Sequence, residues 1–377
     1  MRPKSGLPKR KALRNMPEFA FGLRDNPSLN EFRNPLIGFS SAQFQEELVR
    51  TVSLFAGCGG FDIGLLGGFK YLGETLQPFP FEIVQAYDID ARAVATYNLN
   101  IAPHARVCDL VETPAETLPS ADLLLGGFPC QDFSTSGPKQ GLDGKRGRLY
   151  RVLIDYMRTH RPKVVVAENV PGLAKLHGGA IIDTILAELS EAGYRFKVWS
   201  ILCPDYGLPQ SRRRLFLVGV RDDIDGYPVL PNPTHFMSHR AIDDAIDDLR
   251  DVTDESVTNQ SQYFMATKAT AGGGQGDHVS KRGQLAYTVR ANAKARIHFH
   301  YELPRRLTVR ECARLQSFPD EFVFPHSAMN AMTQIGNAVP PLIAHHVGRS
   351  LLNFFRNLAG TERMALTSAN TLPRKGR

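Results

Sequence analysis

The chain has 377 residues, 42% of them hydrophobic and 22% charged, which is typical of a folded globular protein large enough for two domains. No apolar run approaches the roughly 18 residues of a membrane span, and the N-terminus lacks a signal-peptide pattern. We therefore expect a cytoplasmic protein with no membrane partner. The five cysteines are odd in number and never form a C-x-x-C pair, which argues against disulfides and against a metal site.

The formal net charge of +7 favours a polyanionic partner. Residues 1–14 are basic and free of acids, so they could contact such a partner or simply act as a solubilising tail. Residues 222–255 are rich in aspartate, whereas 268–306 are rich in lysine and arginine. The second stretch is therefore the better candidate for contacting phosphates.

Strands and helices alternate between residues 50 and 220. Short apolar runs predict buried strands at 51–55, 81–87, 122–125, 164–167, 196–202 and 215–220. Helical periodicity lies between them at 91–99, 149–159 and 180–192, and we expect a further helix at about 341–355. This order predicts a doubly wound α/β sheet, which binds ligands beyond the carboxyl ends of its strands.

The first strand is followed by a glycine-rich turn at 55–60, as expected for a nucleotide-type cofactor loop. Asp62 occupies the place of the third glycine of the dinucleotide fingerprint, so a cofactor without phosphates is favoured. Asp88, at the end of the second strand, could accept hydrogen bonds from ribose hydroxyls, and Asp109 from an adenine amino group. Asp88 could equally be a solvated loop acid.

Cys130 follows the strand at 122–125 and is a candidate nucleophile. Gly126 and Gly127 lack a β-carbon and let a flat substrate approach, while Pro129 restricts the backbone that leads to the thiol. An isolated cysteine in this position could also be a buried structural residue.

Six blocks of sequence, in order, resemble the motifs of the DNA (cytosine-5) methyltransferases. They read FAGCGG at 55–60, GFPCQDFS at 127–134, ENV at 168–170, QSRRR at 210–214, RLTVRECARL at 306–315 and QIGNAVP at 334–340. The resemblance spans about 50–355. It implies a Rossmann-like methyltransferase domain that uses S-adenosyl-L-methionine on double-stranded DNA. We expect a monomer without an obligatory protein partner, of the modification type found in restriction–modification systems.

The resemblance also assigns catalytic roles. Cys130 would add to carbon 6 of cytosine, and Glu168, kept protonated by burial, would donate to N3. Arg214 would contact the cytosine O2 and Arg212 would support the pocket, with Asn169 beside Glu168. Alternate residues of a strand share a face, so Arg213 should point away from the pocket.

For the methyl donor, the resemblance implies that Phe55 packs beside the adenine, that Gly57 and Gly59 admit the methionine part, and that Asn337 and Val339 close over it. Ile89 stands where many members carry a larger aromatic residue. The full set of expected donor-binding residues is Phe55, Ala56, Gly57, Cys58, Gly59, Gly60, Asp88, Ile89, Asp109, Leu110, Pro129, Asn337, Ala338 and Val339.

A duplex base must be flipped out before an enzyme can reach its carbon 6. We expect the polar loop after Cys130 to close on the DNA with Gln131, Ser134, Ser136 and Arg146. Thr288 and Val289 resemble a short signature of the family's target recognition domain. Candidate base-reading or phosphate-binding residues there are Thr288, Arg290, Asn292, Lys294 and Arg296.

The expected organisation is a basic arm (1–49), a catalytic and cofactor-binding domain (50–220), a target recognition domain (221–304), a return segment completing the catalytic domain (305–358) and a tail (359–377). An RNA-directed member of the family would share the chemistry, but the spelling around Cys130 and the separate recognition domain favour DNA. A non-catalytic DNA-binding regulator would not need Cys130, Glu168 and Arg214 together.

Overall fold

A seven-stranded sheet forms the centre of the protein in the computed structural model. The structure describes residues 44, 46–129, 149–252, 256–260, 278–291 and 298–370, with side chains described as far as 361. The strand order is β5-β4-β1-β6-β7-β9-β8. The bounds are β1 Val49–Leu54, β4 Phe81–Asp88, β5 Ala105–Val107, β6 Leu123–Gly126, β7 Val164–Asn169, β8 Tyr194–Leu202 and β9 Arg213–Arg221.

All strands of this sheet run in one direction except β9, which is antiparallel to both of its neighbours. Residues 203–212, which include the short helix η5 (Cys203–Tyr206), join β8 to β9. This connection is too short for a parallel crossover, so the chain turns back on itself. The predicted doubly wound α/β fold is confirmed, with one reversed strand.

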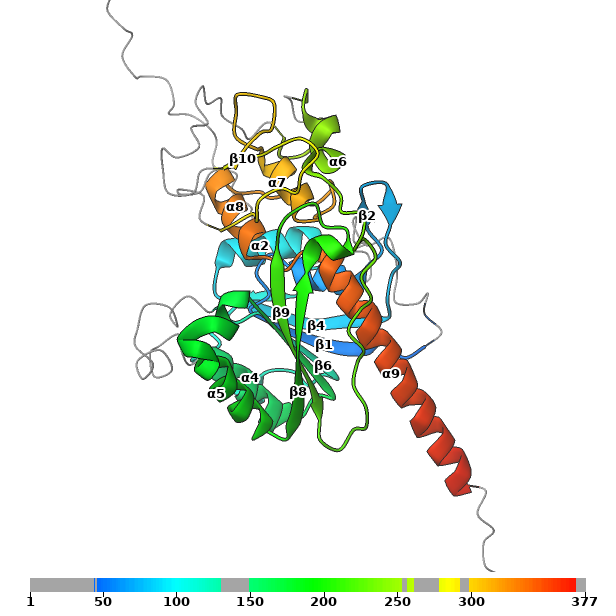
Figure 1. Cartoon of the computed structure of the whole chain (residues 1–377). Helices are drawn as coiled ribbons and strands as arrows, with labels where there is room; N and C mark the ends of the chain where they lie inside the picture. The colour runs from blue at the N-terminus through cyan, green and yellow to red at the C-terminus, as the bar shows by residue number, and fades with distance from the viewer. Residues whose placement is uncertain are drawn as a thin grey trace, which may run out of the picture. The chain divides into compact units, whose positions relative to one another are not determined.

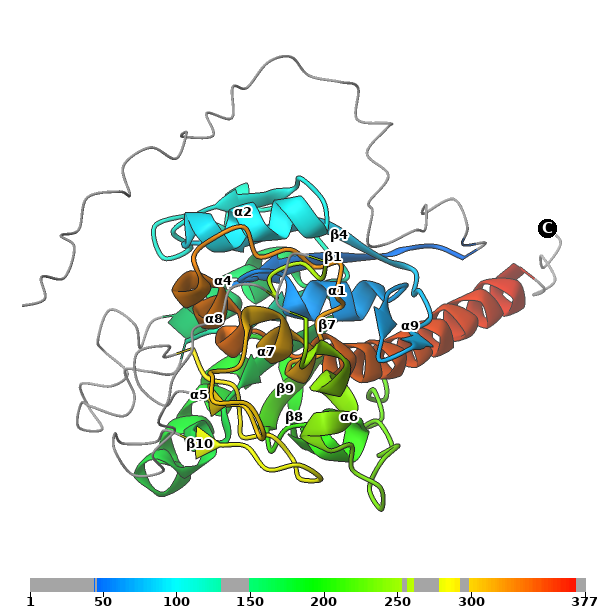
Figure 2. The same ribbon diagram turned by 90° about the horizontal axis from the view of Figure 1, so that it is seen from above.

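Helices cover both faces of the sheet (Figures 1 and 2). Val164 and Val166 of β7 belong to one hydrophobic core with residues of α1 (Gly60–Leu66), α2 (Ala91–Asn100) and α9 (Pro341–Asn370). The alternate residues Val165 and Ala167 belong to a second core with α4 (Leu149–His160) and α5 (Ala180–Ser190). A central strand buried on both faces therefore needs apolar residues throughout, as its sequence shows.

The predicted ends of several elements were wrong by one or two residues. A larger difference is α9, which continues to Asn370 instead of ending at 355 and extends away from the sheet in Figure 2. No proline lies between 355 and the helix end at 370, and a single helical glycine weakens a helix without ending it. The hairpin of β2 (Lys70–Tyr71) and β3 (Glu74–Thr75), which turns at Gly73 with φ of 80°, was not predicted.

The remaining elements are short. They are η2 (Ala115–Thr117), η4 (Pro171–Gly179), α6 (Ile242–Ile246), η6 (Asp247–Leu249), β10 (His278–Val279), β11 (His298–Phe299), α7 (Val309–Leu315) and α8 (Ala328–Asn337). Helix α7 contributes Val309, Cys312, Ala313 and Leu315 to the first core, and its polar side chains add hydrogen bonds to neighbouring segments. Arg310 is fully buried and donates to the carbonyls of Thr258, Pro319 and Phe322. Helix α7 therefore fixes residues before and after it in the chain.

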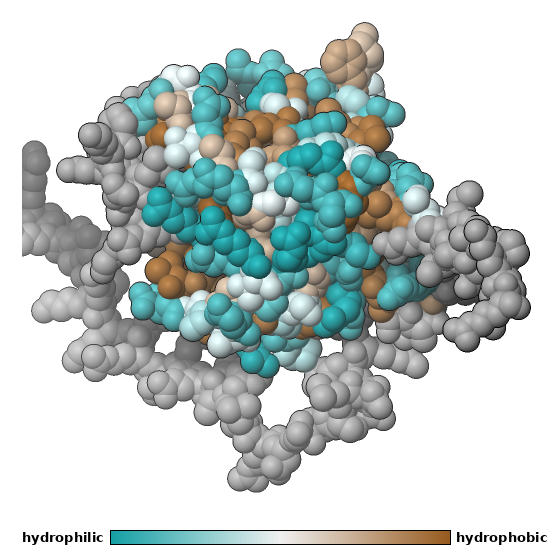
Figure 3. All heavy atoms as spheres, turned by 90° about the horizontal axis from the view of Figure 1, so that it is seen from below, coloured by the Kyte–Doolittle hydropathy of each residue, from teal (hydrophilic) through white to brown (hydrophobic). Residues whose placement is uncertain are grey.

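Hydrophobic residues on the face shown in Figure 3 lie in separate groups between hydrophilic ones. Within the described ranges, no helix is both long and apolar enough to cross a membrane.

Helices α1 and α9 pack in direct contact at Gly64, where a β-carbon would lie 2.3 Å from the Pro341 carbonyl oxygen and 2.4 Å from the Ala344 Cβ. We expect Gly64→Ala to cost about 1–3 kcal/mol of unfolding free energy, because backbone must move to admit the methyl group. Gly360→Ala, in the partner helix α9, is the control, since a β-carbon there meets nothing within 4 Å. Urea unfolding should show a large loss of unfolding free energy for Gly64→Ala and no loss for Gly360→Ala. Equal unfolding midpoints for the two variants would contradict this packing.

Candidate active site

The loop between β1 and α1 has an unusual backbone that its neighbours hold in place. Phe55, Gly57 and Gly59 all have positive φ angles, of 58°, 57° and 90°, a conformation uncommon for a residue with a side chain such as Phe55. The Ala56 N–H donates to the Tyr87 carbonyl at 2.9 Å, and the Gly57 N–H donates to Asp88 Oδ2 at 2.8 Å. Strand β4 therefore determines the shape of the predicted cofactor loop.

The glycines of this loop have different roles. A β-carbon on Gly57 would meet nothing within 4 Å, so the loop is open there. A β-carbon on Gly59 would lie 2.2 Å from Ile101 Cδ1 and 2.8 Å from Tyr97 Cδ2, so this glycine is needed for packing rather than to leave space for a ligand. At Gly60 it would lie 2.5 Å from the Val339 carbonyl oxygen, which places the predicted closing segment 337–339 directly against the loop.

Polar and apolar groups line the open edge beside Gly57. The Asp88 carboxylate also accepts from the Asp90 N–H at 2.9 Å, and burial raises its pKa. Ile89 is 68% exposed, although its side chain is apolar. Asp109 is exposed and accepts from the Val111 N–H at 3.1 Å, whereas the neighbouring Leu110 is buried.

Cys58 does not face this edge. Its side chain is buried and its thiol lies 3.9 Å from the Gln334 carbonyl oxygen, to which it donates. Burial raises the pKa of the thiol to about 12. Cys58 can therefore contribute only its backbone to a ligand site.

A second group of side chains lies at the ends of β7 and β9. Arg214 Nε is 2.7 Å from Glu168 Oε1, and both side chains are nearly buried. Burial raises the pKa of Glu168, while the charges of Arg214 and Arg212 act in the opposite direction. Arg213 is exposed and donates to Ser200 Oγ, so the expected alternation of the three arginines is present.

The backbone that leads to Cys130 lies beside this ion pair. Asn169 Nδ2 donates to the Phe128 carbonyl at 3.0 Å, and its Oδ1 accepts from the Val170 N–H at 2.9 Å. A β-carbon on Gly127 would lie 3.8 Å from Glu168 Oε2 and 3.9 Å from the Phe55 carbonyl oxygen. The end of β6 is thus held between the predicted catalytic acid and the predicted cofactor loop, with Pro129 exposed.

Several predicted residues lie outside the described part of the chain. They are Cys130, Gln131, Ser134, Ser136 and Arg146 in the segment 130–148, and Asn292, Lys294 and Arg296 in the segment 292–297.

Arg212 joins three predicted parts of the site. It is fully buried, with Nη1 donating to the Val289 carbonyl at 2.9 Å and Nη2 donating to the carbonyls of Gly336 and Ala338, both at 3.0 Å. Burial and the nearby Arg214 lower the pKa of Arg212. We refer to these contacts as the Arg212 network.

The sequence analysis missed Gln210, which supports this network. Its Oε1 accepts from the Val289 N–H at 3.0 Å, and its Nε2 donates to the Leu315 carbonyl at 2.6 Å. The sequence did offer one signal for Gln210, since it is the first residue of the motif block 210–214 that also contains Arg212 and Arg214.

Residues expected to take part in target recognition lie beside the Arg212 network. The Thr288 hydroxyl donates to the Ser211 carbonyl, and Arg290 is exposed. A β-carbon on Gly336 would lie 2.2 Å from the Arg290 carbonyl carbon, so helix α8 packs on this backbone. Asn337, at the end of α8, is exposed, and Val339 is buried.

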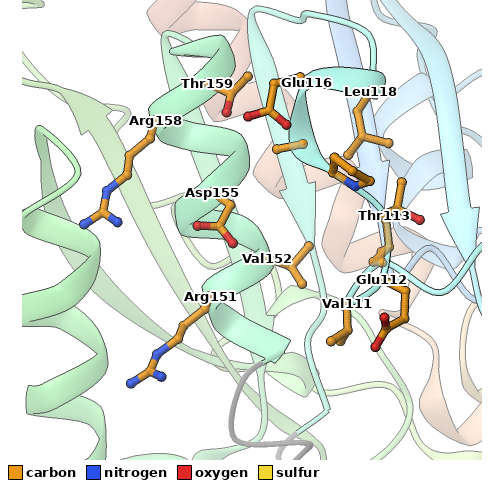
Figure 4. Close-up of a pocket in the computed structure, with 13 residues that line it drawn as sticks. Val111, Glu112, Thr113, Glu116, Leu118, Arg151, Val152, Asp155, Arg158 and Thr159 are labelled. Atoms are coloured by element: carbon orange, nitrogen blue, oxygen red, sulfur yellow. The ribbon is translucent and has the colours of Figure 1, made fainter.

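A surface hollow of about 630 Å³ lies between α4 and residues 110–118 (Figure 4). Glu116 and Val111 lie on the 110–118 side of it, whereas Arg158 and Arg151 extend to the other side of α4. Of the predicted site residues, its lining includes Leu110 but neither Glu168 nor Arg214. This hollow is therefore separate from the buried ion pair.

The chain is similar to known methyltransferases over most of its length. A family model described as C-5 cytosine-specific DNA methylase matches residues 49–272 and 264–353. The type II methyltransferase M.BspRI of Lysinibacillus sphaericus is 31% identical over 362 residues, covering 83% of this chain and 83% of the relative. M.BbvI of Brevibacillus brevis is 32% identical over 344 residues, covering 82% of this chain and 92% of the relative.

Solved structures agree on the fold. A putative DNA modification methyltransferase encoded within an Escherichia coli prophage aligns with a TM-score of 0.64 and 22% identity, covering 82% of this chain and 99% of that chain. The Dnmt2 methyltransferase of S. pombe aligns with a TM-score of 0.58 and 18% identity, covering 81% of this chain and 99% of that chain. Because the family match spans the β1–α9 region that builds the site, this chain belongs to the C-5 cytosine-specific DNA methylases and is a DNA (cytosine-5-)-methyltransferase.

Proposed function

We propose that this enzyme transfers a methyl group from S-adenosyl-L-methionine to carbon 5 of a cytosine flipped out of duplex DNA, through a covalent Cys130 adduct. We further propose that it is the modification enzyme of a restriction–modification system, as its type II relatives suggest. The observation that carries the proposal is the buried Glu168–Arg214 pair beside the strand end that leads to Cys130.

Cytosine carbon 5 is a weak nucleophile, so covalent addition at carbon 6 must come first. The Cys130 thiolate forms the S–C6 bond, and the electron pair of the 5,6 double bond makes carbon 5 nucleophilic. The donor supplies an electrophilic methyl group on a sulfonium. After transfer, a base removes the proton from carbon 5 and the Cys130 sulfur leaves carbon 6, which restores the double bond and the thiolate.

Glu168 is proposed to stabilise the ring during this addition. Its carboxyl must hold a proton to donate to N3, and burial favours that neutral form. Arg214 would contact the cytosine O2, and Asn169 would act as a positioning residue because it holds the Phe128 carbonyl two residues before Cys130.

The open edge beside Gly57 is proposed to bind the donor. The residues present fit an adenosyl group without phosphates, since Gly57 leaves open space, Ile89 offers an exposed apolar side chain and the Asp88 carboxylate can accept from ribose hydroxyls. A pyrophosphate is disfavoured because Asp62 places a buried carboxylate in the first turn of α1. The proposed donor site would be completed by Phe55, Asp109, Leu110, Asn337 and Val339.

DNA is proposed to contact the loop after Cys130, through Gln131, Ser134, Ser136 and Arg146, and the recognition domain at 221–304. Support for the second surface is the attachment of Thr288 and Val289 to the Arg212 network, because this attachment holds the recognition segment next to the pocket. Arg290 would read a base edge from there.

Covalent catalysis can be tested with duplex DNA that carries 5-fluorocytosine at the target position, first located by base-resolved sequencing of methylated genomic DNA. Fluorine cannot leave carbon 5 as a cation, so the complex should stay joined after methyl transfer. A denaturing gel should show an adduct only with S-adenosyl-L-methionine, and peptide mapping should place it at Cys130. Cys130→Ser should form no adduct and transfer no methyl group; an active Cys130→Ser enzyme would refute the mechanism.

The environment of Glu168 predicts a pH-dependent stability change for Arg214→Met. Without its partner, the pKa of Glu168 in the folded state rises further. When a carboxyl has a higher pKa in the folded than in the unfolded state, the free energy of unfolding increases as pH falls. Relative to the unchanged protein, the free energy of unfolding of the variant should be lower by about 3 kcal/mol at pH 8 and by clearly less at pH 5.5. Arg213→Met, which changes an exposed arginine, is the control. A loss for Arg214→Met that is the same at both pH values would show that Glu168 is not the affected group.

Base reading by Arg290 can be separated from phosphate binding. Arg290→Gln should reduce discrimination at one position of the target by about 1–3 kcal/mol, or roughly 5- to 150-fold, with little change in the salt dependence of binding. Lys281→Gln, another exposed basic residue of the same segment, should leave discrimination unchanged. If Arg290→Gln instead weakens binding to all sequences equally and flattens the salt dependence, Arg290 contacts phosphate.

A further inference from the structure

We propose that Asp62 and Tyr97 are positioning residues for the methyl donor, which hold the loop 55–60 in its binding conformation from the side opposite the donor. Both side chains are fully buried, so neither can touch the donor itself. The inference rests on the proposed donor site and assigns a role to residues outside it.

Asp62 connects the start of α1 to the sheet. Its Oδ1 accepts from Ser53 Oγ of β1 at 2.8 Å, and its Oδ2 accepts from the Tyr97 hydroxyl of α2 at 2.8 Å. Burial raises the pKa of this carboxyl to about 6. A buried carboxylate is costly unless its oxygens are hydrogen-bonded, so both donors are needed to keep Asp62 where it is.

Tyr97 acts on the loop at two points. Its hydroxyl donates to Asp62 and lies 3.0 Å from His104 Nε2, which must therefore donate to the phenol oxygen. Burial lowers the pKa of His104 to about 4, so the neutral ring with a proton on Nε2 satisfies this arrangement. The ring of Tyr97 also fills the space beneath Gly59, where a β-carbon would lie 2.8 Å from Cδ2.

These contacts support the part of the loop that β4 does not reach. Asp88 and Tyr87 anchor Gly57 and Ala56, whereas Gly59 and the first turn of α1 depend on Tyr97 and Asp62. The loop holds Phe55, which has a side chain, at a positive φ of 58°, so it needs support from its surroundings to remain in this shape. Loss of the Tyr97 hydroxyl should let the loop adopt other conformations. Because the loop must then be reordered when the donor binds, the binding free energy becomes less favourable.

The test compares two variants that each remove one buried tyrosine hydroxyl. Tyr97→Phe keeps the ring beneath Gly59 and removes only the hydrogen bond to Asp62. Tyr194→Phe is the matched control, because its hydroxyl is also buried and donates to the Pro162 carbonyl at 2.8 Å, at the start of β8 and away from the loop. Affinity for S-adenosyl-L-methionine and for its demethylated product is measured by calorimetry on the full chain, together with urea unfolding.

We expect Tyr97→Phe to weaken binding of both molecules about fivefold to tenfold, the effect of one hydrogen bond, while kcat at saturating donor stays within about twofold. Tyr194→Phe should lower stability to a similar degree and leave affinity unchanged. Ser53→Ala removes the other donor to Asp62 and should reproduce the Tyr97→Phe effect, which keeps the test decisive if Tyr97→Phe does not fold.

The inference is refuted if Tyr97→Phe and Ser53→Ala bind the donor as tightly as the unchanged protein, or if Tyr194→Phe weakens binding to the same extent. Failure of the unchanged protein to bind either molecule would instead refute the proposed donor site.

Discussion

The buried guanidinium of Arg212 is the interaction on which the geometry of the site depends. A buried charge is costly unless it is hydrogen-bonded, and Arg212 donates from Nη1 and Nη2 to three backbone carbonyls. These carbonyls belong to two segments that are distant in sequence, one carrying Thr288 and Arg290, the other carrying Asn337 and Val339. Both segments are thereby fixed to the strand that also carries Arg214.

Backbone carbonyls are suited to this role because they carry no net charge. A carboxylate partner would neutralise Arg212, whereas the carbonyl dipoles accept from Nη1 and Nη2 and leave the positive charge in place. Burial and, after it, the charge of Arg214 lower the pKa of Arg212, and the charges of both arginines oppose the rise that burial causes in the pKa of Glu168. The positive field of the two arginines favours thiolate formation and stabilises negative charge that develops on a bound base.

The donor loop is supported in a different way. It is held from one side by the carboxylate of Asp88 and from the other by the buried contacts of Asp62 and Tyr97, so two neighbouring elements, β4 and α2, determine its shape. Direct packing of Gly60 against Val339 then joins this loop to the segment fixed by Arg212. The proposed donor loop and the proposed cytosine pocket are consequently connected through packed and hydrogen-bonded segments.

The sequence by itself determined the fold class and the family. Strand and helix periodicities are local properties, and each of the six motif blocks is a continuous stretch of sequence. It also indicated that Arg212 and Arg214 differ from Arg213, since alternation along a strand is a local property. The tertiary structure decided what local patterns do not contain. It showed that Gly59 is required by the packing of Tyr97 and Ile101 and that Cys58 faces the interior. It also showed that Gln210 accepts from Val289 and that Arg212 binds carbonyls far away in the chain. These roles depend on which segments meet in space, and hydrophobic periodicity does not specify such contacts.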